Sequence, residues 1–111
     1  MHFGAFFYGT VDMHDAGVEG PPAHRRNYRQ EDYRSVYDDL IAYAKTCDAL
    51  GYDSFWTAEH HFHNHGFEVI PNVLLFNAVL AQHTQRIRLG ALIHVLTAWH
   101  PIHFAEDYAL A

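Results

Sequence analysis

The sequence has little cysteine and few basic residues, and each shortage excludes a class of protein. Cys47 is the only cysteine, so no disulfide can form within the chain, and a reducing compartment is expected. Seven Lys and Arg stand against thirteen Asp and Glu, the formal net charge is -6, and the basic residues form no long run. Because phosphate binding needs clustered positive charge, nucleic acid is not an expected partner.

Long apolar runs and a leader pattern are also missing. No stretch reaches the roughly 18 apolar residues of a membrane span. Residues 1–6 lack the charged region and cleavable apolar segment of a signal peptide. We therefore expect a cytoplasmic protein with no membrane partner. The seven glycines form neither a G-x-G-x-x-G pattern nor a P-loop, which argues against a Rossmann-type nucleotide site.

Aromatic residues and histidines are plentiful by contrast. Phe, Trp and Tyr make up 15% of the chain, and four of the eleven histidines lie between His60 and His65. Histidine exchanges protons near neutral pH. A histidine cluster beside aromatic side chains therefore indicates a candidate functional site.

The apolar pattern changes its period along the chain and predicts alternating strands and helices. Three short apolar or aromatic runs are typical of buried strands: residues 2–8, 52–58 and 87–95. Helices are expected over residues 32–50, from Pro71, and from Pro101 to the end. Repeated strand–helix units imply an α/β fold with a parallel sheet. A (β/α)8 TIM barrel has about 250 residues, so this chain would hold its N-terminal three to four βα units.

The first two expected helices each have an apolar face. Over residues 32–50 it consists of Val36, Leu40, Ala44, Cys47 and Leu50. Cys47 is therefore expected in the core, and Gly51 is expected to cap the helix in the left-handed conformation. Pro71 is expected at the first position of the second helix. The face of that helix consists of Val73, Leu74, Asn77, Leu80, Ala81 and Thr84.

Two further features concern the boundaries of the chain. Residues 9–31 predict a long irregular loop, of a length that is usually functional or disordered. The last expected helix is still running at Ala111, whereas the start has the character of a native N-terminus. We therefore expect residues 1–111 to be one partial barrel domain whose C-terminal part is missing. By itself such a piece would leave sheet edges and faces bare, so aggregation and inactivity are expected of it.

The main candidate site follows the second expected strand, in the sequence Glu59-His60-His61-Phe62. Barrel enzymes place their active sites at the carboxyl ends of their strands. A carboxylate beside imidazoles can set their tautomers for acid–base catalysis. The alternative is a histidine that only caps the strand and hydrogen-bonds to the backbone.

The clustered histidines also raise the alternative of a metal site. Neighbouring residues on a strand point to opposite faces, so His60 and His61 are poorly placed to share an ion. His63 and His65 could join His61 on one face only in an extended segment, and Gly66 indicates a turn. Because no Cys or carboxylate stands at zinc-ligand spacing, no metal is expected.

A second candidate lies at the end of the third expected strand. Its apolar residues, Leu92 and Ile93 among them, could offer a flat platform to a ring system. The alternative, ordinary barrel core, explains these residues at least as well. His100 is interpreted as the residue before the last helix, because Pro101 starts that helix.

Four stretches together resemble the bacterial luciferase-like, flavin-dependent monooxygenase family. They span nearly the whole chain: residues 1–6, 51–56 running into 59–62, 86–90, and 100–107. The Glu-His-His-Phe element after an aromatic strand end, followed by the Arg-x-Arg-Leu-Gly strand, is the most specific part. The sequence departs from the luciferases at Thr97, where they have a proline.

The resemblance implies a barrel enzyme that oxidises an aldehyde or another small organic substrate with reduced FMN and O2. By motif, His60 takes the place of the family's active-site histidine, supported by His61 and Glu59. The implied cofactor-binding residues, which contact the isoalloxazine ring or line its pocket, are Phe6, Leu92 and Ile93. A separate flavin reductase is an implied partner, and the full-length protein is expected to form a homodimer or another oligomer.

Two other functions stay open from the sequence. One is hydride transfer with the deazaflavin F420, which replaces FMN in some branches of the superfamily. The other is flavin or partner binding without catalysis. The family's phosphate-binding residues and its reactive cysteine come later than the region that this chain matches.

Overall fold

Three parallel strands form the sheet of this chain, in the order β1-β2-β3. A computed structural model describes residues 1–12, 25–62 and 66–111. Its elements are β1 (Gly4–Phe7), α1 (Gln30–Ala49), β2 (Ser54–Thr57), α2 (Val73–Ala81), β3 (Arg88–Ala91) and α3 (Pro101–Leu110). The order confirms the predicted α/β fold, with three parallel βα units of a partial TIM barrel. Each strand is shorter than its predicted range. Of the predicted loop at 9–31, residues 13–24 lie outside the described residues.

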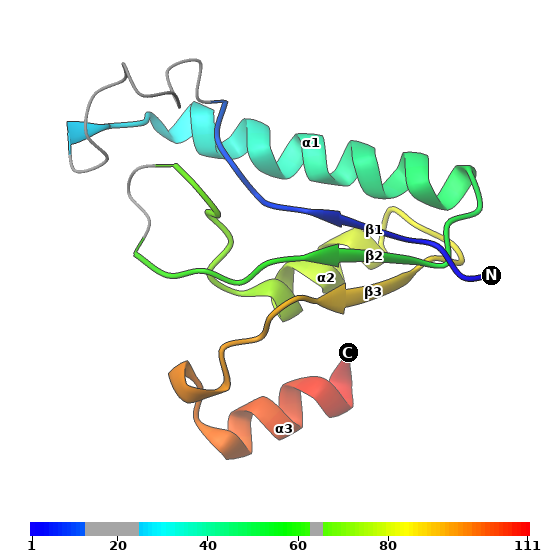
Figure 1. Cartoon of the computed structure of the whole chain (residues 1–111). Helices are drawn as coiled ribbons and strands as arrows, with labels where there is room; N and C mark the ends of the chain where they lie inside the picture. Colours follow the sequence, from blue (N-terminus) through cyan, green and yellow to red (C-terminus); the bar gives the residue numbers. More distant parts are fainter. Residues whose placement is uncertain (13–24, 63–65) are drawn as a thin grey trace.

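The strand register sorts the side chains onto two faces. Phe6, Trp56 and Gly90 lie side by side on the three strands, and successive residues point to opposite faces. Phe55 is fully buried, whereas Trp56 is 38% exposed. Figure 1 shows α1 and α2 beside the sheet, and both helices share one hydrophobic cluster with Phe55. In the described residues helices therefore cover the Phe55 face, and the Trp56 face stays open.

The buried face of α1 agrees with the predicted spacing except at its end. Its buried residues are Val36, Leu40, Ala44, Cys47 and Asp48. Leu50 is 70% exposed, so its predicted place in the core is wrong, because α1 ends at Ala49 before the chain turns away. Burial raises the pKa of the Cys47 thiol, in agreement with the predicted core position of this residue.

The helix ends show where local rules succeed and where they fail. Gly51 has a φ of 82° and donates to Asp48 O, while the next backbone N–H donates to Cys47 O, which confirms the left-handed cap. Pro101 is the first residue of α3, as predicted. Pro71 does not begin α2, because the Asn72 side chain caps that helix by accepting a 2.9 Å hydrogen bond from Leu75 N–H. The buried residues of α2 are Val73, Phe76 and Leu80.

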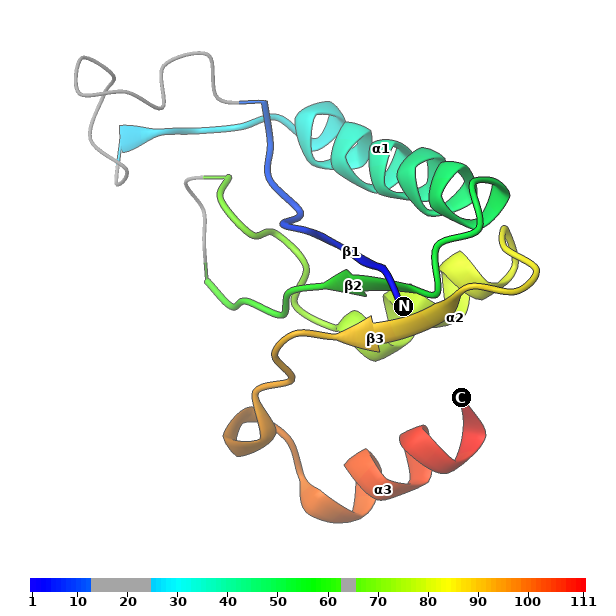
Figure 2. The same ribbon diagram turned by 45° about the vertical axis from the view of Figure 1, so that its right-hand side comes forward.

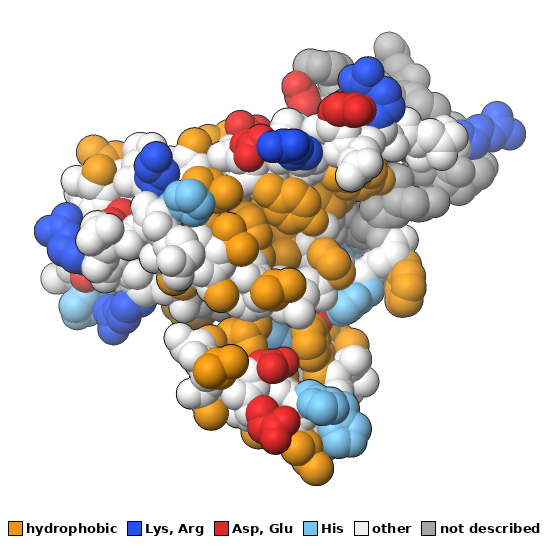
Figure 3. Space-filling view, turned by 180° about the vertical axis from the view of Figure 1, so that it is seen from behind, with side chains coloured by type: hydrophobic (Ala, Val, Ile, Leu, Met, Phe, Trp, Pro, Cys, Tyr) orange, Lys and Arg blue, Asp and Glu red, His pale blue; other side chains and the backbone are white. Residues whose placement is uncertain are grey.

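The third helix lies away from the sheet and contains no buried residue (Figure 2). A short 3-10 helix, Leu96–Ala98, connects it to the β3 end. Hydrophobic side chains also gather on the outer face around α2 (Figure 3), where Leu75 is 66% and Val79 40% exposed. Among the described residues, no helix is long and apolar enough to cross a membrane.

Candidate active site

The carboxyl ends of the three strands meet at one edge of the sheet. Phe7, Thr57 and Ala91 are in register there, so the residues that follow them converge. An open pocket of about 420 Å³ lies at this edge. It is lined by Phe6, Tyr8, Ala58, Glu59, His60, Glu68, Leu92, Ile93 and Val95. The structure therefore brings together all the predicted site residues except His61, which is not in this lining.

Backbone hydrogen bonds keep the end of β3 beside β2 after regular pairing stops. Leu92 N–H donates to Thr57 O at 2.8 Å, and Glu59 N–H donates to Ile93 O at 3.3 Å. The Leu92–Ile93 peptide bond is cis. Leu92 is 47% and Ile93 73% exposed, so they form an apolar wall of the pocket. That these two residues form a platform for a ring system stays a prediction.

His60 is held at the pocket by its backbone N–H and by Nδ1 of its ring, while Nε2 faces a carboxylate. Its N–H donates to Ile70 O at 3.0 Å. Its Nδ1 accepts a 3.1 Å hydrogen bond from the backbone N–H of His61, so the proton of the neutral ring is on Nε2. Nε2 lies 3.4 Å from Glu68 Oε2, and the two side chains are 40% and 13% exposed. His60 is thus a partly exposed histidine with a carboxylate partner.

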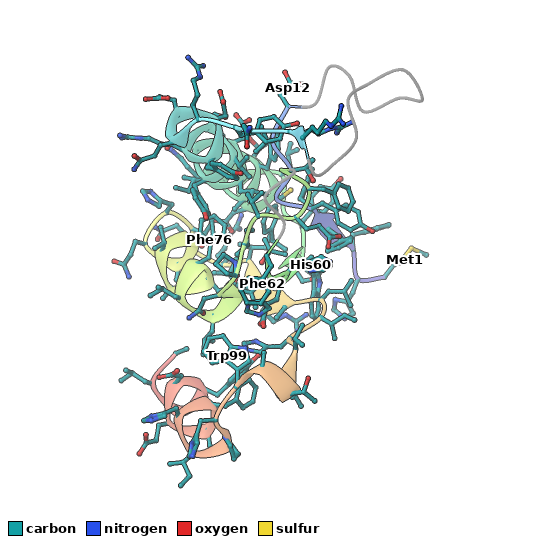
Figure 4. All side chains as sticks on the ribbon, turned by 90° about the vertical axis from the view of Figure 1, so that its left-hand side faces the viewer. Met1, Asp12, His60, Phe62, Phe76 and Trp99 are labelled. Atoms are coloured by element: carbon teal, nitrogen blue, oxygen red, sulfur yellow. The ribbon has the colours of Figure 1, made fainter. Side chains whose placement is uncertain are left out.

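Glu59 has a different environment, because its side chain has no exposed surface. Its Oε1 accepts hydrogen bonds from Trp99 Nε1 and His61 Nε2, both at 2.8 Å. Its Oε2 lies 3.2 Å from His94 Nε2, an ion-pair distance at an angle that does not make a hydrogen bond. Two N–H groups, those of Trp99 and His61, therefore offset part of the cost of burying this carboxylate, and Oε2 has no hydrogen-bond partner among the described residues. Figure 4 shows Trp99 between the sheet and α3, near the end of β2.

Sequence patterns did not identify His94 or Glu68 as parts of the site. His94 is 7% exposed and contacts the rings of Trp99, Phe104 and Tyr108, at centroid distances of 5.1, 4.7 and 5.6 Å. The available signal was a histidine near the end of the apolar run 87–95, after the apolar stretch 89–93. For Glu68 the only nearby signal was weaker, the turn residue Gly66. No periodic pattern marks a side chain that a loop brings back to a strand end.

The possible metal site depends on residues that are only partly described. Among residues 1–12, 25–62 and 66–111, no group of three or more His, Cys, Asp or Glu could hold a metal ion. His63 and His65 lie outside the described residues.

Several monooxygenases, a flavin-dependent one among them, are similar in sequence to this chain. A family model described as "Luciferase-like monooxygenase" matches residues 1–111. The oxygenase component of the flavin-dependent trigonelline monooxygenase of Acinetobacter baylyi is 37% identical over 81 residues, which are 73% of this chain and 22% of that protein. Limonene 1,2-monooxygenase of Rhodococcus erythropolis is 33% identical over 103 residues, which are 93% of this chain and 24% of that protein.

Two solved structures have a similar fold. The oxygenating constituent of 3,6-diketocamphane monooxygenase of Pseudomonas putida, in complex with FMN, gives a TM-score of 0.67 at 28% identity, over 96% of this chain and 24% of that one. The apo form of MsnO8 gives a TM-score of 0.71 at 26% identity, over 98% of this chain and 29% of that one. The chain thus spans between 22% and 29% of the lengths of these four proteins.

Proposed function

This chain belongs to the luciferase-like monooxygenase family, and we propose that the protein uses reduced FMN and O2 to oxidise a small organic substrate. One observation carries the proposal. At the carboxyl edge of the sheet, His60 lies in the same pocket as the exposed apolar wall of Leu92 and Ile93. Active sites of barrel enzymes lie at this edge.

The residues present fit one wall of a flavin site. Leu92 and Ile93 offer exposed apolar surface of the kind that a planar ring covers in a ligand pocket. Phe6 and Tyr8, also in the lining, meet edge to face at a centroid distance of 4.6 Å. The FMN complex of the Pseudomonas putida relative supports this choice of cofactor. When bound, reduced FMN would supply the electrons for the activation of O2.

In this proposal His60 is the acid–base residue. The backbone N–H of His61 occupies its Nδ1, so the proton available for transfer is on Nε2, at the pocket. A positioned acid or base typically accelerates a reaction by about 10²–10⁴-fold. The apolar walls would exclude water, which limits the loss of reducing equivalents as hydrogen peroxide. His61 and Glu59 would act indirectly, through the end of β2.

The proposed partners follow from the relatives. The Acinetobacter baylyi relative is an oxygenase component, so we expect a separate flavin reductase to supply the reduced FMN. Homodimerisation or another oligomeric state is also part of the proposal. The substrate class is a small organic molecule, because the relatives include monooxygenases of trigonelline, limonene and alkanals.

Binding and turnover by the full-length protein test this function. FMN and F420 are titrated separately, each in its reduced form, and the complex with FMN is mixed with O2 and an alkanal, trigonelline or limonene. We expect FMN to bind and one substrate to be oxygenated. Binding of F420 alone would replace the proposal by hydride transfer. FMN binding without oxygenation of any of the three, or of a wider set of small molecules, would leave a flavin-binding protein without this activity.

A further inference from the structure

The two adjacent histidines of the site have different carboxylate partners. His61 Nε2 pairs with Glu59 Oε1 at 2.8 Å, and His60 Nε2 lies 3.4 Å from Glu68 Oε2. We propose that Glu68 is the positioning residue for His60, and that it directs the Nε2 proton of this ring for the acid–base step. This inference depends on the proposed function, and it changes the assignment of Glu59, which the sequence motif places in support of His60.

The backbone around Glu68 has an unusual conformation. Glu68 has a φ of 52°, in the left-handed region that residues with a side chain seldom adopt, and Gly66 shortly before it has a φ of 86°. Such a conformation persists only where the surroundings hold it, and it is common at functional sites. Here it turns the chain back so that the Glu68 side chain lines the same pocket as His60.

Hydrogen bonds on both sides of Glu68 fix this turn. Val11 N–H donates to Gly66 O at 2.8 Å, and Val69 N–H donates to Gly9 O at 2.6 Å. Val69 O accepts a hydrogen bond from a tyrosine hydroxyl of α1, and Ile70 O accepts the backbone N–H of His60 itself. The carboxylate therefore belongs to a backbone segment that is bonded directly to the residue that it serves.

Glu68 can orient the His60 ring in a way that Glu59 cannot. With Nδ1 of His60 taken by a backbone N–H, only Nε2 can exchange a proton with a ligand, and the Glu68 carboxylate faces that atom. A carboxylate there favours the tautomer with the proton on Nε2 and one rotation of the ring. Oε1 of Glu59 is already bonded to Trp99 and His61. Glu59 therefore holds the end of β2 together, and Glu68 serves the reactive ring.

Nitrogen NMR of the histidine rings in the full-length protein tests the pairing without any turnover. Glu68→Gln removes the charge at nearly constant size, and Glu59→Gln does the same for the other pair. We expect Glu68→Gln to shift the ring signals of His60, assigned with His60→Gln, and to leave those of His61 in place. Glu59→Gln should do the reverse. Glu31→Gln is the matched control, since Glu31 is 77% exposed at the start of α1.

Activity supplies the second arm. With whichever substrate the parent protein oxidises, we expect Glu68→Gln to lower product formation about tenfold or more, within the range of acid–base catalysis. The FMN affinity of Glu68→Gln should stay within about threefold of the parent value, as expected for a group that acts on the acid–base step and not on FMN binding. Glu68→Asp, which keeps the charge, should recover part of the rate, whereas Glu31→Gln should match the parent.

The two arms separate this inference from the proposed function. If the His60 signals in Glu68→Gln equal those in Glu31→Gln, the pairing is wrong, whether or not the protein turns out to be an oxygenase. If the His60 signals shift but product formation is unchanged, Glu68 contacts His60 without a positioning role, and the inference fails. If no variant and no parent protein binds flavin, the proposed function fails while the NMR result still decides the pairing.

Discussion

The indole N–H of Trp99 donates a 2.8 Å hydrogen bond to the buried carboxylate of Glu59. This bond joins the loop before α3 to the segment that follows β2, although α2 and β3 lie between them in the sequence. Since α3 itself has no buried residue, the ring contacts and polar bonds around Glu59 and His94 hold this loop against the sheet.

The first prediction concerns this bond. Trp99→Phe removes a donor from a buried carboxylate, and an acceptor left short of partners costs about 1–3 kcal/mol. We expect a loss of that size in the free energy of unfolding of the full-length protein, measured with urea. Tyr108→Phe is the control, because the hydroxyl of Tyr108 makes a long hydrogen-bond contact, 3.4 Å to His94 Nδ1, at an exposed position. Equal effects of both variants would contradict the prediction.

The second prediction concerns Asp48, a buried carboxylate that accepts backbone N–H groups of Gln85, Arg86 and Ile87 at 2.7, 3.1 and 2.9 Å. These bonds, with that to Gln85 the strongest cause, lower the pKa of Asp48 from its ordinary value of 3.8. Because the pKa of Asp48 is lower in the folded protein, its ionised carboxylate stabilises the protein above pH 3.8. This stabilisation is lost as the pH falls through the folded-state pKa of Asp48.

Asp48→Asn should therefore lower the melting temperature of the full-length protein at neutral pH. Its amide nitrogen cannot accept a hydrogen bond, and its single oxygen cannot serve three donors. The difference from the parent should shrink as the pH falls below about 4, because the parent carboxylate then becomes protonated. A difference that stays constant from pH 7 to the acid limit would show that ionisation of Asp48 does not matter.

The third prediction concerns the open face of the sheet. Trp56 lies across Gly90 of the neighbouring strand, and a Cβ at Gly90 would overlap the six-membered ring of the indole. Gly90→Ala should destabilise the full-length protein by about 1–3 kcal/mol, the usual effect of overpacking. Adding Trp56→Leu should remove most of this penalty, and the double-mutant cycle measures the coupling. Additive effects would mean that the indole does not rest on Gly90.

The fourth prediction concerns His60. In the full-length protein, His60→Ala should reduce product formation and raise the share of reducing equivalents released as hydrogen peroxide, because the group that moves the proton is lost. The measurement is the ratio of product to peroxide per reduced FMN consumed. An unchanged ratio would rule out the role of His60, and His83→Ala serves as a control, since His83 is exposed after the end of α2.

The fifth prediction concerns residues 1–111 expressed alone. Large apolar side chains stay exposed in this chain, among them Leu75 at 66%, Ile93 at 73%, Ile102 at 62% and Leu110 at 89%. Exposed apolar patches and unpaired strand edges favour aggregation. We expect binding of a hydrophobic dye, no cooperative melting and no FMN binding. A sharp melt with FMN bound would contradict this expectation.

The candidate site was predictable to the extent that it depends on strand ends. A parallel sheet brings the residues after β1, β2 and β3 to one edge, so the motif at His60 and the apolar pair Leu92 and Ile93 had to meet there. The partners of the histidines were not predictable in this way. Glu68 and His94 reach the site through a turn and through ring packing, and neither feature leaves a periodic pattern in the sequence.

By itself, the sequence determined the order of strands and helices, the position of Cys47 in the core, the glycine cap at Gly51 and the start of α3 at Pro101. Each depends on helical spacing or on the backbone preference of one residue, and both are local. The Asn72 cap, after which α2 begins at Val73, is local as well, since it bonds the N–H of Leu75 three residues on. Only the tertiary structure decided that Leu50 is exposed and which carboxylate pairs with which histidine. Those outcomes depend on where distant segments meet, and long-range contacts set that position.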